Sequence, residues 1–146
     1  MKLLFTTLSF LFTITCFAQT KSIRFEMFFG NDLSNDSTTL ILNGVTVAKN
    51  IKLEPAMMSP KSLIITQNSK ALLIEPYHGK SYTLPKLKIV KNILSVKIYV
   101  NNVWKEFRFN LIKGKFFFVE LPIRNNGKKD FNQLIVRQSV KGPIYL

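Results

Sequence analysis

Apolar and polar residues alternate with a period of two along most of the chain after its first twenty residues. In residues 23–29, for example, Ile, Phe, Met and Phe alternate with Arg, Glu and Phe. Such alternation is typical of half-buried β-strands, because successive side chains of a strand point to opposite faces. No window longer than about ten residues has the spacing of an amphipathic helix. The pattern therefore predicts a protein built from strands.

Two turns between alternating stretches can be placed from the asparagines that they contain. Asn43-Gly44 separates two apolar stretches and favours a type I′ turn, in which both central residues have positive φ. Asn101-Asn102 joins the stretches 94–100 and 104–111, and asparagine tolerates the same left-handed backbone. We predict a hairpin at each turn, and their resemblance suggests a domain with two similar halves.

Several shorter stretches complete the predicted strand order. Residues 62–66 and 71–74 read as two short strands around a polar turn, and 115–121 and 134–136 as two later strands. Residues 76–85, which begin and end with proline, are expected to be irregular.

One further strand is predicted where lysine alternates with apolar residues. Leu87 and Ile89 alternate with Lys86 and Lys88, a pattern typical of an exposed or edge strand whose lysines discourage edge-to-edge pairing. About nine or ten short strands at close, regular spacing predict an all-β fold, an antiparallel β-sandwich, with a small β-barrel as the alternative.

Residues 1–18 have the composition of an export signal. Lys2 supplies the positive start, residues 3–17 are largely apolar, and Ala18 is the small residue expected before a cleavage point. The apolar run is at most about 16 residues, shorter than the roughly 20 that span a bilayer as a helix. A transmembrane anchor is therefore less favoured than a cleaved signal-peptide helix.

The end of this segment carries one resemblance and one alternative. Phe-Ala-Gln at residues 17–19 resembles the ends of signal peptides from small exported proteins of Bacteroidota-type bacteria, which implies export. Lipidation at Cys16 is the alternative, but Thr15 stands where lipoprotein signals usually have Gly, Ala or Ser. We expect residues 19–146 to form one domain, secreted or held in the periplasm or cell envelope.

Charge narrows the class of partner. The 146 residues include 21 Lys and Arg against 8 Asp and Glu, a formal net charge of +13. Residues 76–146 contain 14 basic and three acidic side chains, whereas residues 19–75 contain six and five. Most of the basic residues are lysines. Lysine produces a diffuse positive field, whereas the planar guanidinium of arginine recognises a phosphate or carboxylate group with two hydrogen bonds. This favours an anionic polysaccharide or membrane surface as partner, although lysine can also serve only for solubility.

A candidate binding face follows from the alternation in residues 94–111. Lys97 and Arg108 share one side of the predicted hairpin with Tyr99 and Trp104, and aromatic rings beside cations stack on sugars or bases. Exposed Trp is equally typical of protein interfaces, for which Phe28 and Phe117 are further candidates. The candidate binding residues are Lys86, Lys88, Lys97, Tyr99, Trp104 and Arg108.

The composition leaves little room for catalysis or for a cofactor. His78 is the single histidine, and the single cysteine lies in the signal segment, so Cys-His catalysis and zinc sites are not expected. Residues 79–81, Gly-Lys-Ser, lack the preceding glycine and the following helix of a phosphate-binding loop, so we expect no nucleotide. Asp32 and Asp36 fit Asx turns better than a calcium loop.

The acidic residues also give no clear catalytic pair. Glu106 and Glu120 could lie on neighbouring strands, but ion pairing with nearby lysines is the commoner arrangement. The sequence thus predicts an exported, non-enzymatic binding module for an anionic glycan or envelope surface, without metal or cofactor. The alternative is a protein-interaction or accessory subunit of a cell-envelope complex, and a nucleic-acid partner is not favoured.

Overall fold

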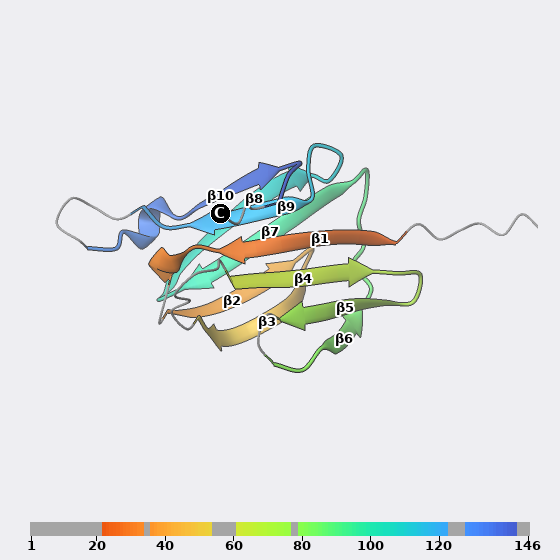
Figure 1. The fold of residues 1–146 in the computed structure, drawn as a ribbon, viewed down its shortest axis with the longest axis horizontal. Helices are drawn as coiled ribbons and strands as arrows, with labels where there is room; N and C mark the ends of the chain where they lie inside the picture. Colours follow the sequence, from red (N-terminus) through yellow and green to blue (C-terminus); the bar gives the residue numbers. More distant parts are fainter. Residues whose placement is uncertain (1–21, 34–35, 54–60, 77–78, 123–127, 143–146) are drawn as a thin grey trace, which may run out of the picture.

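The computed structural model describes residues 22–33, 36–53, 61–76, 79–122 and 128–142, and these form two packed β-sheets (Figure 1). The strands are β1 (Ile23–Phe29), β2 (Ser37–Leu42), β3 (Val45–Lys52), β4 (Lys61–Gln67), β5 (Ala71–Pro76), β6 (Tyr82–Pro85), β7 (Ile93–Val100), β8 (Val103–Asn110), β9 (Phe116–Glu120) and β10 (Ile135–Ser139). Two short 3₁₀ turns, η1 (Asn31–Leu33) and η2 (Phe131–Gln133), follow β1 and precede β10. The predicted signal segment lies outside the described residues.

The ten strands are divided between a six-stranded and a four-stranded sheet. The larger sheet has the order β10-β9-β1-β4-β5-β6, and the smaller has the order β3-β2-β7-β8. Within the described part of the chain neither sheet closes into a barrel, so the all-β prediction is confirmed and the arrangement is sandwich-like. Both predicted hairpins lie side by side in the smaller sheet, and the strand pairs that follow them, β4–β5 and β9–β10, lie on either side of β1 in the larger sheet, an order that agrees with two similar halves.

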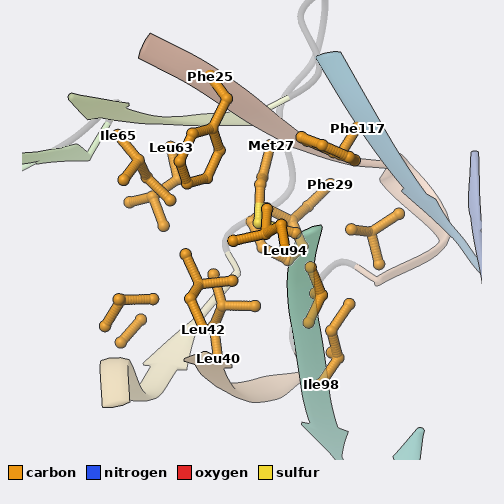
Figure 2. Close-up of a cluster of buried hydrophobic side chains, with 14 of the residues drawn as sticks. Phe25, Met27, Phe29, Leu40, Leu42, Leu63, Ile65, Leu94, Ile98 and Phe117 are labelled. Atoms are coloured by element: carbon orange, nitrogen blue, oxygen red, sulfur yellow. The ribbon is translucent and has the colours of Figure 1, made fainter. Parts of the chain in front are cut away.

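The space between the two sheets is filled by the inward-facing side chains, which occupy every second position of the strands. In β7 the even-numbered residues from Leu94 to Val100 are at most 1% exposed, and the intervening residues face outward. Figure 2 shows inward side chains of both sheets meeting in one apolar cluster. Its labelled members are Phe25, Met27, Phe29, Leu40, Leu42, Leu63, Ile65, Leu94, Ile98 and Phe117. Burial of this apolar surface is the main force that holds the sheets together.

Three turns use the left-handed backbone that asparagine and glycine tolerate. Asn43 and Gly44 have φ of 44° and 83° between β2 and β3, as the type I′ prediction requires. Asn101 and Asn102, with φ of 44° and 66°, join β7 to β8 as predicted. Residues 91–92 form a third such turn, before β7, which the sequence reading did not predict.

Two expectations about pairing and extent are wrong. The larger sheet is not wholly antiparallel, because β1 and β9 pair in parallel, with Met27 opposite Phe117. Residues 82–85 form the edge strand β6, within the segment that was expected to be irregular. Sequence alternation identifies a strand but not its neighbour, and the partners β1 and β9 are far apart in the chain.

Two phenylalanines considered for an exposed interface are buried. Phe117 points into the core and contacts Phe25 edge to face, with ring centroids 6.0 Å apart. Phe28 points to the opposite face of β1, where it is only 2% exposed and stacks on Phe118 at 5.2 Å. Neither ring is available to a partner.

Candidate functional site

The segment that connects the two sheets between β6 and β7 determines where several lysines lie. Residues 86–90 form no strand, and only Val90 takes part in an isolated bridge, with Ile93, so the predicted edge strand is wrong. Leu87 is 1% exposed and belongs to the core. The buried side chain of Gln67 accepts a hydrogen bond from Leu87 N at 2.7 Å and donates one to Leu87 O at 3.2 Å. A side chain thus replaces the neighbouring strand for this residue.

A second side chain attaches the same segment to the smaller sheet. Asn43, in the β2–β3 turn, donates through Nδ2 to Lys88 O at 2.8 Å, and its Oδ1 accepts from Ser95 N at 2.6 Å. The segment therefore crosses the end of the sandwich with Leu87 pointing inward. Lys86 and Lys88, which precede and follow Leu87 in the sequence, are exposed to solvent.

Five connections meet at this end of the sandwich, which is the right-hand end in Figure 1. They are residues 43–44, 68–70, 86–92, 111–115 and 140–142, and we call them together the lysine end. The segments contain seven lysines, all exposed, and no aspartate or glutamate. The seven are Lys70, Lys86, Lys88, Lys91, Lys113, Lys115 and Lys141.

Acidic residues lie at the opposite end or on the sheet faces. Asp36, after η1, accepts hydrogen bonds from Lys129 Nζ at 2.7 Å and from Asn101 Nδ2 at 2.6 Å. Glu120, at the far end of β9, pairs with Arg137. Among the residues that the structure describes, no salt bridge includes any of the seven lysines of the lysine end. Their charge is thus directed to solvent.

Large apolar side chains are also exposed at the lysine end. Ile112 is 74% exposed, Val140 70% and Val90 55%, and Ile93 is exposed as well. Ile112 and Val140 line one shallow hollow of about 480 Å³, so the two loops that bear them are neighbours. Leu111 N donates to Asn92 O at 2.9 Å, which places the turn at 91–92 beside the same loop.

A second surface is the outer face of the smaller sheet. Tyr99 and Trp104 are directly opposite each other in β7 and β8, and Trp104 is 62% exposed. Lys97 Nζ lies 5.6 Å from the centre of the Trp104 ring, within the range of a cation–π contact. With Thr39 and Ile41 of β2, these three residues line a shallow hollow of about 340 Å³.

The charge of Lys97 on this face is already paired. Its Nζ lies 3.3 Å from Glu106 Oε2, and Ser95 Oγ donates to Glu106 Oε1 at 3.0 Å. The hydrogen bond from Ser95, which has the larger effect, and the one from Lys97 lower the pKa of the Glu106 carboxyl below its ordinary value. Arg108 is exposed one row further along β8, opposite Ser95.

The six predicted binding residues therefore divide between two surfaces. Lys97, Tyr99, Trp104 and Arg108 share the outer face, as alternation predicted, whereas Lys86 and Lys88 belong to the lysine end. Alternation did not indicate the other five lysines of that end or its exposed aliphatic residues. The one available signal was a repeated dipeptide: an exposed β-branched residue precedes lysine at 90–91, 112–113 and 140–141.

The structure gives physical reasons against the other chemistries. Hydrogen bonds from Lys129 and Asn101 account for both carboxylate oxygens of Asp36, so this residue needs no calcium ion. Strand β6, not a helix, follows Gly79-Lys80-Ser81. Glu106 and Glu120 lie in different sheets and each has its own ion pair. The described residues contain no cluster of three metal-ligating side chains, and His78 lies outside them.

Comparison with known proteins adds no relative. The chain matches no family model, no curated protein and no solved structure. None of the helices among the described residues is long and apolar enough to cross a membrane.

Proposed function

We propose that this protein is a non-enzymatic binding module that attaches to an anionic surface of the cell envelope through its lysine end. The observation that carries the proposal is the separation of charge along the sandwich. The five connecting segments contain seven exposed lysines and no acidic residue, and Glu26 of β1, which lines the same hollow as Lys115, is already paired with Arg24. Export, predicted from residues 1–18, would bring this end to such a surface.

The alternative role for the lysines is solubility, which predicts a different distribution of charge over the surface. Solubilising charges work best when both signs are mixed over the whole surface. Here the sheet faces follow that rule, with the pairs Arg24–Glu26 and Lys97–Glu106, and the lysine end does not. A single-sign patch is costly through self-repulsion and is typical of surfaces that attract the opposite charge.

A charge-matched pair of variants tests the location of the binding surface. The end variant combines Lys88→Gln, Lys113→Gln and Lys141→Gln, and the control combines Lys49→Gln, Lys52→Gln and Lys80→Gln. All six lysines are exposed and outside the salt bridges among described residues, so the variants have the same net charge. The probes are vesicles with one-third anionic phospholipid and beads bearing a sulfated polysaccharide.

The end variant should lose most of the binding and the control little. Each lysine near an anionic membrane contributes about 1 kcal/mol, so three losses correspond to about a 100-fold weaker affinity. Binding of the wild type should weaken as salt is raised, because the attraction is screened. Equal losses in both variants, or no binding to either probe at low salt, would reject the proposal.

The outer face favours a second candidate, contact with a protein partner as an accessory subunit. Trp104 and Tyr99 are exposed beside a shallow hollow, and the neighbouring Lys97 is neutralised by Glu106. Aromatic residues with little unpaired charge are typical of the centre of protein interfaces. Trp104→Ala should then abolish capture of that partner while leaving binding to anionic vesicles unchanged.

A further inference from the structure

We infer that the lysine end binds a lipid bilayer specifically, with its exposed aliphatic side chains inserted among the lipids; this rests on the proposed function. The lysine end combines exposed aliphatic residues with lysines. Val90, Ile112 and Val140 are each more than half exposed, and each is followed directly by a lysine. Three separate loops thus present the same pair, one aliphatic and one cationic residue.

A soluble polyanion explains only half of this pattern. Phosphate or sulfate groups of a polymer in water attract lysine, but they give an isoleucine no reason to remain exposed. The surface of an anionic bilayer offers both environments within a few ångströms. Its headgroups attract lysine, and the acyl boundary below them removes apolar side chains from water.

The three loops are close enough to act on one surface. Lys115 N donates to Ser139 O at 3.1 Å, which attaches the loop of Ile112 to the end of β10, just before Val140. Asn92 O accepts from Leu111 N at 2.9 Å, which attaches the turn of Val90 to the other side of the same loop. Ile112 and Val140 therefore line one hollow, and the turn that carries Val90 is hydrogen-bonded to the loop of Ile112, so all three residues belong to connected loops of the lysine end.

The loops are also held in place before binding. Gln138, on β10, donates through Nε2 to Asn110 O at 2.6 Å and to Gly114 O at 2.8 Å. A Cβ at Gly114 would lie 2.3 Å from Ser139 O, so the backbones of the two loops approach more closely than any other residue permits. Because the loops already have a fixed conformation, they lose little conformational entropy when they insert, and this favours a higher affinity for the bilayer.

Fluorescence of one inserted indole tests the depth of binding. Trp104, the only tryptophan, lies on the sheet face, so Trp104→Phe removes the native signal. Ile112→Trp in that background places the indole at the lysine end, and Ile135→Trp places it on β10 as the control. With anionic vesicles whose acyl chains carry bromine, we expect at least twofold quenching for Ile112→Trp and little for Ile135→Trp.

Loss of the aliphatic residues gives a second readout. Ile112→Ser combined with Val140→Ser should weaken binding to anionic vesicles at least tenfold and leave binding to sulfated polysaccharide beads unchanged. Ile135→Ser combined with Trp104→Ser, at exposed positions elsewhere, should affect neither.

The possible outcomes separate the two proposals. Binding to both probes with no quenching at position 112 would reject insertion and keep the attachment to an anionic surface. Binding to vesicles without anionic lipid as strongly as to anionic vesicles would reject both, since the lysines would then be unused. Absence of binding to either probe would likewise reject both.

Discussion

At the scale of single residues, the turns that depend on the backbone preference of asparagine and glycine could be predicted from the sequence. Asn43-Gly44 and Asn101-Asn102 adopt the left-handed backbone because their side chains tolerate it. The turn at Lys91 and Asn92 was missed because lysine is no turn former, although Asn92 beside it is. Nothing in the sequence indicated that Asn43 would also bind Lys88 and Ser95, residues more than forty positions away.

Gln67 is the residue whose loss should most disturb the lysine end. Gln67→Leu would leave the N–H and C=O of buried Leu87 without partners, and we expect a loss of about 1–3 kcal/mol in the free energy of unfolding. Urea denaturation measures this loss. Hydrogen exchange of residues 86–90 should also become faster, because the segment is attached to the larger sheet through this side chain.

A glutamine outside the core provides the comparison. Gln133 is exposed in η2, so Gln133→Leu should change the unfolding free energy by no more than about 0.5 kcal/mol. If both variants were equally stable, the hydrogen bonds of the Gln67 side chain would not hold residues 86–90 in place.

At the scale of elements, the strands were largely predictable and their partners were not. Residues 86–90 have the same alternation as a strand, but hydrogen bonds from Gln67 and Asn43 take the place of a neighbouring strand. The parallel pairing of β1 with β9 depends on contacts across nearly ninety residues of chain. Local patterns do not report such contacts, because alternation states only which face of a strand is buried.

The edges of the two sheets are joined by Tyr82, whose hydroxyl donates a hydrogen bond from β6 to Val47 O of β3. Tyr82→Phe removes this bond, and we expect a loss of about 1 kcal/mol in unfolding free energy at pH 7. Burial raises the pKa of the Tyr82 phenol above its ordinary value of 10.0. The folded state therefore favours the neutral hydroxyl, and its stabilising effect is complete below pH 10.

The contribution of the Tyr82 hydroxyl to the free energy of unfolding should disappear in strongly alkaline solution. As pH rises from 10 through the higher pKa of the folded state, the unfolded chain ionises first and wild-type stability falls. The difference from Tyr82→Phe should therefore shrink as pH rises above 10, in urea titrations where lysine ionisation affects both proteins equally. Tyr99→Phe, which removes a bond within one hairpin, should cost less. A difference from Tyr82→Phe that stayed constant above pH 10 would mean that the ionisation of Tyr82 does not affect stability.

At the scale of the whole molecule, the sequence predicted how much charge there is but not where it gathers. The basic second half was evident, yet Lys70 comes from the first half and the other six lysines from three later loops. Only the strand directions bring these loops to one end. Alternation identified the outer-face group of Lys97, Tyr99 and Trp104 because those residues lie in one hairpin, where sequence distance and spatial distance agree.

End-on binding predicts an orientation that lysine labelling can measure. β7 has eight residues, so the sandwich is about 26 Å long in the strand direction, several times the Debye length of about 8 Å at physiological salt. Lysines of the lysine end should therefore be protected from acetylation on anionic vesicles, by at least fivefold. Lys52, which is at the far end of β3, should react as in solution. Uniform protection of all lysines would instead mean that the protein lies on its side or binds in no fixed orientation.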